Sequence, residues 1–176
     1  IIPTTWWEGA VKASGEILPG LGYDAMVSTG LKTSKAEIRS GRQKGAKAVA
    51  EDFAYTARLK YTGIKGLELG VAWHQEQDLS QSNVAGSGET ADMLEAHVGY
   101  QLAGLSVRAL HARWKIDDLA AAIANGAEQE GGYLELGYKP LEKVGVFARF
   151  SEWDKWTAAS NNIDRVAQWN YGVNYW

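Results

Sequence analysis

The sequence predicts an all-β fold, an antiparallel up-and-down array of about nine strands in a single domain, residues 1–176. Large apolar residues alternate with small or polar ones in segments about ten residues long, the length of a tilted membrane-spanning strand. Tight turns and long loops connect these segments in alternation. The composition is rich in Gly (20), Trp (8) and Tyr (8) and poor in Pro (3), which favours strands and turns.

In each segment the apolar residues occupy every second position. The clearest case runs from residue 51 to 62, where Tyr55 and Leu59 alternate with Thr56 and Arg58. In the segment 105–115 neither phase keeps both of its arginines, at 108 and 113, off the apolar side, and a bulge near Ala109 would reconcile them. We expect strands at residues 7–14, 21–30, 51–62, 67–74, 94–101, 105–115, 132–139, 144–153 and 165–176.

The connections differ in length in a regular way. Tight ones lie around Pro19 and at 62–66, 102–104 and 139–143, whereas long ones cover 31–50, 77–90, 116–130 and 154–164. Every second connection is therefore a loop, which places all the long loops at one end of the sheet. Within the third, DDLAAAIANGAE has an Asp cap, an Ala-rich body and Gly126 as a stop, and predicts a short helix.

The polar side of the predicted strands carries Gly, Ala, Ser, Gln, Asn and single charges rather than a surface rich in Lys and Glu. Aromatic residues such as Trp73, Tyr100, Trp114 and Trp169 gather near segment ends, where girdles at a membrane interface would hold them. We therefore place the apolar side in lipid and the polar side around a water-filled lumen. The alternative is a soluble β-barrel or sandwich that uses Trp and Tyr to bind sugars or lipids.

Several stretches, taken in order, resemble the middle and later strands of the phosphate-selective porins (porins O and P) of Gram-negative outer membranes: TTWWEGAVKASGE, LPGLGYD, SGRQKGAKA, GLELGVAWH, RALHARWKID, GGYLELGYKP, VFARFSEWD and QWNYGVNYW. The resemblance implies a homotrimeric channel in the outer membrane, with about sixteen strands per chain. It would contact lipid and lipopolysaccharide and pass small hydrophilic solutes, leaning to anions such as phosphate. Nine strands are about half of such a barrel, so we expect further strands at both ends.

The loop from 31 to 50 is the candidate constriction because selectivity in wide pores comes from fixed charges at the narrowest point. It holds six basic residues and one acid, Glu37, a local charge of +5 in a chain of net charge −3. The alternative is a solvated extracellular loop whose lysines bind lipopolysaccharide or nothing. The constriction candidates are Lys35, Arg39, Arg42, Lys44 and Lys47.

Charged residues in the polar phase of the strands are candidates for lining the pore. The basic ones would extend a basic track along the wall, and Arg113 would join them if the bulge exists. The acidic ones share the same phase and weaken the case for strict phosphate selection, as do Glu8, Glu16 and Asp24. The pore-lining candidates are Lys12, Arg58, Lys60, Arg149, Glu68, Glu95 and Glu135.

No enzyme, cofactor or nucleic-acid partner is expected. The net charge is close to neutral and there is no cysteine. The three histidines, at 74, 97 and 111, lie in different segments without the spacing of a metal site. Ser14, Asp24 and His97 could be assembled on paper into a hydrolase, but nothing in the sequence marks them out.

Overall fold

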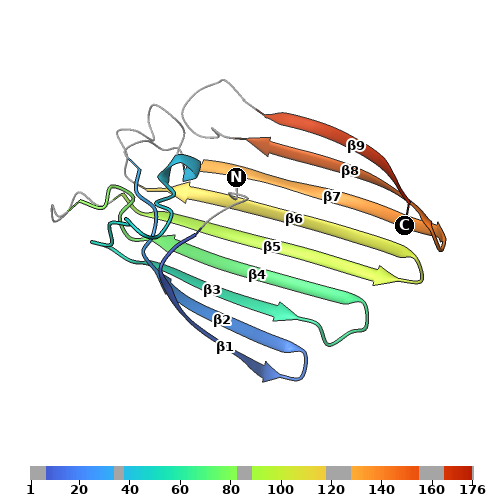
Figure 1. Ribbon diagram of the computed structural model, residues 1–176, viewed down its shortest axis with the longest axis horizontal. Coiled ribbons are helices and arrows are strands. Elements are labelled where there is room, and N and C mark those ends of the chain that lie inside the picture. The colour runs from blue at the N-terminus through green and yellow to red at the C-terminus, as the bar shows by residue number, and fades with distance from the viewer. Residues whose placement is uncertain (1–6, 34–37, 83–88, 118–127, 155–164, 176) are drawn as a thin grey trace.

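The computed structural model describes residues 7–33, 38–82, 89–117, 128–154 and 165–175, and their strands form one antiparallel sheet (Figure 1). The strands follow each other in chain order, so the predicted all-β, up-and-down arrangement of nine strands is confirmed. A short 3-10 helix, η1, covers Ile38–Gly41. The strands are β1 (Ala10–Leu18), β2 (Leu21–Ser28), β3 (Ala54–Tyr61), β4 (Leu67–Glu76), β5 (Ala91–Leu102), β6 (Leu105–Ile116), β7 (Glu128–Leu141), β8 (Val144–Asp154) and β9 (Val166–Tyr175).

Tight turns join the strands at one end of the sheet, and the long connections lie at the other, as predicted (Figure 1). In the β5–β6 turn the backbone conformation is that of a tight hairpin, since Ala103 and Gly104 both have positive φ, 48° and 83°. Two consecutive residues of this kind form the hairpin turn whose twist matches that of the flanking strands. The helix predicted within 117–128 falls almost wholly outside the described residues. Among the described residues, no helix has the length and hydropathy needed to span a bilayer.

The pairing between strands keeps residues of one phase on one face across the whole sheet. Register shifts occur between Glu16 and Leu18 and between Tyr138 and Leu141, next to turns. Ala109 pairs with Val98 and Leu134 without any shift, so the predicted bulge is wrong. The two arginines of β6 therefore lie on opposite faces.

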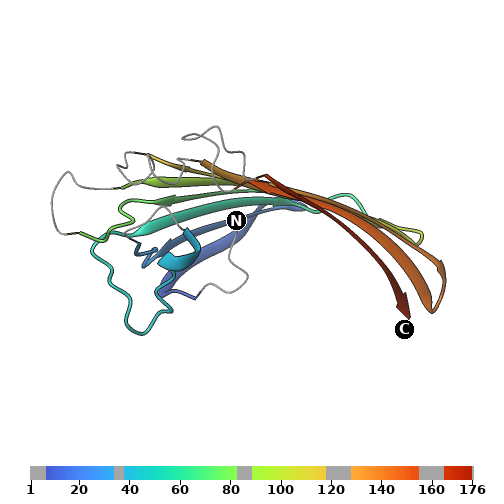
Figure 2. The same cartoon turned by 90° about the horizontal axis from the view of Figure 1, so that it is seen from above.

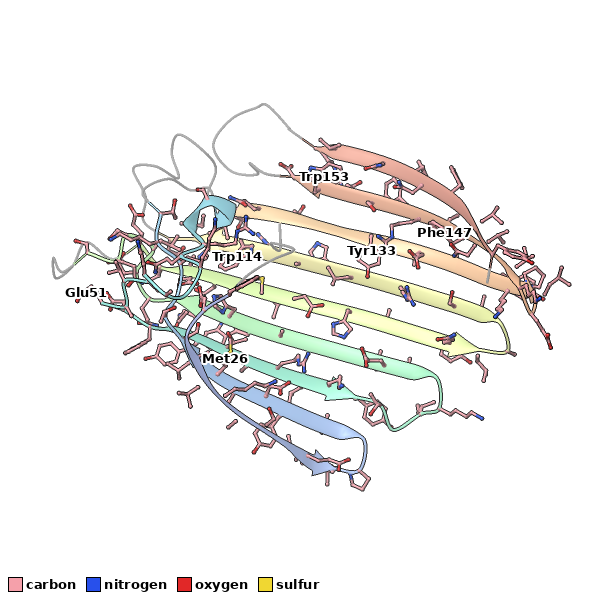
Figure 3. The ribbon with its side chains drawn as sticks, viewed as in Figure 1. Met26, Glu51, Trp114, Tyr133, Phe147 and Trp153 are labelled. Carbon is pink, nitrogen blue, oxygen red and sulfur yellow. The ribbon has the colours of Figure 1, made fainter. Side chains whose placement is uncertain are left out.

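The sheet is curved, and its two faces differ in character (Figure 2). The concave face carries the polar phase of every strand, and the β2–β3 connection with η1 lies on this side. The convex face carries the apolar phase, and many of its side chains are exposed: Val71 is 50% exposed and Tyr171 72%. Figure 3 shows side chains along the whole length of the strands.

The largest buried cluster lies at the loop end of the concave face, not in the middle of the sheet. Leu31 and Ile38 from the β2–β3 connection and Leu79 from the β4–β5 connection pack on inward side chains of β5 and β6, among them Met93 and Trp114. Trp114 is fully buried (Figure 3). Its assignment to an interfacial girdle is wrong, because it belongs to the concave phase of β6 and is covered by these connections.

Candidate functional site

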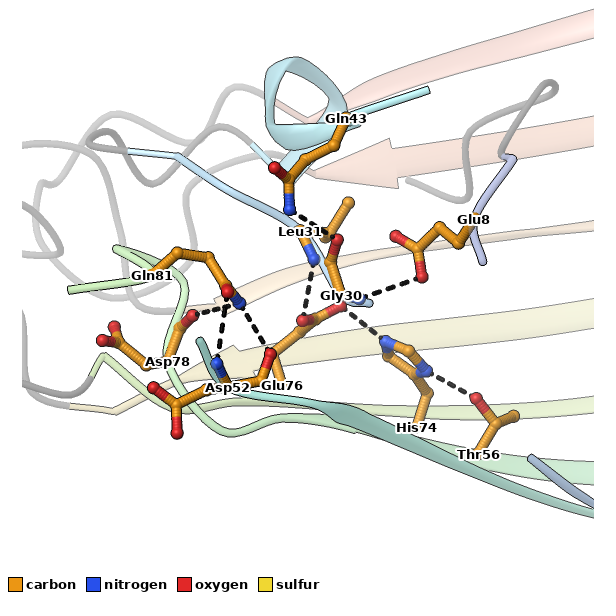
Figure 4. A network of polar contacts seen from close by, with 10 residues as sticks. All are labelled: Glu8, Gly30, Leu31, Gln43, Asp52, Thr56, His74, Glu76, Asp78 and Gln81. Carbon is orange, nitrogen blue, oxygen red and sulfur yellow. Dashed lines mark hydrogen bonds and ion pairs between the residues drawn. The ribbon is translucent and has the colours of Figure 1, made fainter. Parts of the chain in front are cut away.

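The candidate site is the concave face together with the connection that lies over it. Two adjoining hydrogen bonds fasten the start of the β2–β3 connection to the wall (Figure 4). The backbone N–H of Leu31 donates to Glu76 Oε2 at 2.9 Å, and that of Gly30 donates to Glu8 Oε2 at 3.2 Å. A Cβ added to Gly30 would lie 2.6 Å from Glu76 Oε2, so this close approach requires glycine.

Glu76 is itself held by the neighbouring strands. Its other oxygen, Oε1, lies 2.8 Å from His74 Nε2, and His74 Nδ1 lies 2.7 Å from Thr56 Oγ1 on β3. His74 and Glu76 are both buried, and the imidazole meets Trp114 edge to face. A buried carboxylate needs such partners, because an unpaired one would lose its hydration without compensation. This chain of contacts therefore fixes the first residues of the connection against β3 and β4.

Two glutamine side chains brace the rest of the connection. Gln43 donates to the carbonyl oxygens of Gly30 and Val49 and accepts from the Val49 N–H at 2.7 Å. Gln81 accepts from the N–H groups of Glu51 and Asp52 and donates to the Asp52 carbonyl at 3.0 Å. In this segment no neighbouring strand pairs with the backbone, and each side-chain amide supplies the hydrogen bonds that such a strand would make.

The described parts of the β4–β5 connection, residues 77–82 and 89–90, meet at a buried acid, Asp78. Its carboxylate accepts hydrogen bonds from the Ser80 hydroxyl and from the N–H groups of Ser80, Ser82 and Glu89. Burial alone would raise the pKa of Asp78, but these hydrogen bonds outweigh it and hold the pKa below its ordinary value. The same connection supplies Leu79 to the buried cluster, and the Leu79 carbonyl accepts from the Thr33 N–H at 2.6 Å.

The constriction candidates are spread along the connection. Lys35 lies outside the described residues, and Arg39 belongs to η1, where only its backbone is described. Arg42 is half-buried, whereas Lys44 and Lys47 are exposed. The apolar residues of the connection thus serve as its anchors, and the described lysines face water.

Across β1 to β3 the concave face holds a charged cluster centred on Asp24. Lys12 Nζ lies 2.7 Å from Asp24 Oδ1, and Arg58 Nε donates to Oδ2 at 2.7 Å. The Ser14 hydroxyl donates to Oδ1 at 2.7 Å. One carboxylate therefore holds two cations in fixed positions.

Across β3 to β5 a second cluster has more acid than base. Lys60 lies 4.0 Å from Glu68, and His97 lies between Glu68 at 3.6 Å and Glu95 at 2.7 Å. The imidazole rests on Gly70, since a Cβ there would lie 2.1 Å from its Cε1.

Across β6 to β8 a third cluster again has two cations on one acid. Glu135 binds Arg149 at 2.8 Å and Arg108 at 3.4 Å. The guanidinium of Arg149 also lies over the ring of Tyr133, 4.2 Å from its centre. All seven pore-lining candidates thus lie on the concave face, and every basic one contacts an acid, so this face carries a mixed-charge belt in which the expected acids accompany the bases.

Arg113 does not join this belt. It lies on the convex face near the loop end of β6, beyond the apolar band, and contacts Glu128 at 2.5 Å. Lys115 contacts Asp117 at 2.8 Å in the same region. These ion pairs mark where the convex face changes from apolar to polar.

The hydrolase arrangement does not form. Ser14 and Asp24 are in contact, but His97 lies on β5, three strands from β2, or about 14 Å at the usual strand spacing. No group of three or more His, Asp or Glu suited to a metal ion occurs among the described residues.

Sequence reasoning missed the residues that hold the connection inward, Glu76, Asp78 and Gln81. For Glu76 and Asp78 the signal is the polar stretch HQEQD at 74–78, which begins in the last residues of β4 and runs past its end. The sequence does not reveal that Glu76 and Gln81 bond the backbone N–H groups of Leu31 and Glu51, 45 and 30 positions away.

Comparison with known proteins gives one sequence similarity and one structural similarity. No model of a known protein family matches the chain. An uncharacterized protein of Aquifex aeolicus (strain VF5) is 22% identical over 211 residues, which cover 99% of this chain and 47% of that protein, so the chain spans about half the length of this relative. A solved structure of the NanC porin, in a rhombohedral crystal form, aligns with a TM-score of 0.47 at 12% identity, covering 96% of this chain and 92% of that one.

Proposed function

We propose that this chain forms part of the wall of an outer-membrane β-barrel channel through which small hydrophilic solutes diffuse passively. The observation that carries the proposal is the contrast between the two faces of the curved sheet. The convex face exposes large apolar side chains, including Leu134, Leu136 and Val173, over a surface far wider than soluble proteins leave in water. The concave face carries charged and polar groups that water can solvate.

The edges of the sheet support the same proposal. Within the described residues, β1 and β9 each pair on one side only. Unpaired backbone groups are not tolerated in hydrocarbon, so in a membrane both edges need partner strands. We propose that these come from further strands of a longer barrel, of about sixteen strands as in the porins that the sequence resembles, and that three copies assemble.

Solute preference is proposed to lean to anions such as phosphate. The support is the charge of +5 in the connection at 31–50, whose anchors hold it over the concave face. The mixed-charge belt supports a weak preference for anions and not strict selection, because each cation there is compensated by an acid. Lipopolysaccharide is the proposed partner of the outer rim.

The test is planar-bilayer conductance of the full-length protein across a KCl gradient, repeated with phosphate as competitor. We expect stable channels, a reversal potential on the anion side and a phosphate-dependent fall in chloride current. A reversal potential on the cation side would contradict the anion preference but not the channel itself. Three results together would instead indicate a soluble binding protein. These are an absence of conductance, a protein that stays dispersed without detergent, and gel mobility that heating does not change.

A further inference from the structure

A polar hollow of about 520 Å³ lies on the concave face towards the turn end of the sheet, away from the anchored connection. Its size is within the range of small-molecule sites. It is formed by β5 to β9, and its lining includes Gln101, Ser106, Arg108, Glu135, Phe147 and Asn174.

Phe147 is a large apolar residue on the polar, concave face. Its neighbours along β8 in the same phase are Gly145 and Arg149. It pairs with Gly137 on β7 and with Gly172 on β9, so glycine lies on both sides of it. A Cβ on Gly172 would lie 2.2 Å from Phe147 Cε1, which shows that the ring rests against this glycine. The ring therefore lies beside the backbone of β9 and gives the hollow an apolar surface (Phe147 is labelled in Figure 3).

The rest of the hollow is equipped for hydrogen bonding. Gln101 and Ser106 are direct cross-strand partners, and Asn174 enters from β9. Amides and hydroxyls both donate and accept. Arg108 and Glu135 add a charged donor and a charged acceptor that already face each other at 3.4 Å.

We propose that this hollow is a binding subsite for a hydroxylated ring, such as a neutral sugar, on the solute pathway; this rests on the proposed channel function. The apolar face of the sugar ring stacks on Phe147, and its hydroxyls bond the surrounding amides, the serine and the Arg108–Glu135 pair. Paired donors and acceptors suit hydroxyl groups, which require both. Inorganic phosphate is a poorer match, because it has no apolar face for Phe147 and is repelled by Glu135.

The test compares Phe147→Leu with a matched control, Phe150→Leu. Phe150 lies on the same strand but on the convex face, packed 4.9 Å from Trp169 between ring centres. Channel current is measured in KCl alone and then with increasing glucose, or with sorbitol, which has six carbons as glucose does and one more hydroxyl but no ring. Saturation-transfer NMR of glucose with the full-length protein in detergent micelles measures binding without conductance.

We expect glucose to reduce the current in a saturable way and sorbitol to have no saturable effect. Phe147→Leu should raise the half-blocking glucose concentration roughly threefold to tenfold, the usual contribution of an aromatic contact, and Phe150→Leu should not. Equal effects of both probes, no glucose effect in a conducting channel, or an unchanged Phe147→Leu would each overturn the subsite. A protein that fails to conduct yet binds glucose through Phe147 would disprove the channel and leave the subsite standing.

Discussion

Glu76 on β4 accepts a 2.9 Å hydrogen bond from the backbone N–H of Leu31, 45 residues earlier in the chain. Both residues are fully buried, and Leu31 belongs to the cluster that also holds Trp114. A single carboxylate thus joins the inner wall to the start of the basic connection. It is one of several contacts that hold this connection over the concave face.

Replacing this carboxylate should release the connection. In Glu76→Ala the Leu31 N–H and the His74 imidazole lose their partner, at a cost of about 1–3 kcal/mol. We expect faster hydrogen exchange at the Leu31 amide and about tenfold faster tryptic cleavage after Lys44 and Lys47. Glu51→Ala is the control, since that side chain is exposed and only its backbone N–H bonds Gln81. Equal protection in both variants would contradict a role of the Glu76–Leu31 hydrogen bond in holding the connection.

Removing the shared acid of the third cluster should shift ion preference. Glu135→Gln frees Arg108 and Arg149 from their common carboxylate and makes the wall more positive. We expect the ratio of chloride to potassium permeability to rise roughly twofold in a KCl gradient. Glu142→Gln removes the same charge in the β7–β8 turn and should leave the ratio unchanged. Equal shifts would mean that only overall charge matters.

Neighbouring residues on β4 should differ in how much the same substitution destabilises the fold. Val71→Lys puts a charge on the convex face and should cost about 2–4 kcal/mol of folding free energy in lipid vesicles. Ala72→Lys faces the concave side between Arg58 and Glu95 and should cost much less. Folding into vesicles followed by gel mobility without heating measures both. If Val71→Lys folded as well as Ala72→Lys, the convex face would not contact lipid.

The acid in the β4–β5 connection should make local stability depend on pH. Because the pKa of Asp78 is lower in the folded protein than its ordinary 3.8, the stabilisation is complete above that value and is lost as the pH falls below it. Asp78→Asn should lower the thermal midpoint in micelles at pH 7, and the gap to the unmodified protein should narrow as the pH falls below 3.8. Asp52→Asn serves as the control because its known contacts use the backbone. A gap that does not depend on pH would contradict this assignment.

Much of the sheet could be predicted because alternation has a direct physical cause. Successive side chains of a strand point to opposite faces, so Tyr55 and Arg58 are separated by phase alone. Turn positions follow from residues such as Gly104, which adopts positive φ without strain. The same logic failed for Arg113 and Trp114, because phase does not report how far along a strand the apolar band extends or what covers the end of the strand.

The sequence by itself determined the strand order, the two faces, the alternation of turns and loops and the placement of the seven pore-lining candidates on one face. It did so because these depend on local period and on neighbours in the chain. Only the tertiary structure decided that the connection after β2 lies over the concave face, and that Lys12 and Arg58 share Asp24 instead of forming a basic track. Those outcomes depend on which segments, far apart in the sequence, the fold brings together. A carboxylate bonds the donors that lie next to it in the folded chain, and the period of a single strand does not report which donors those are.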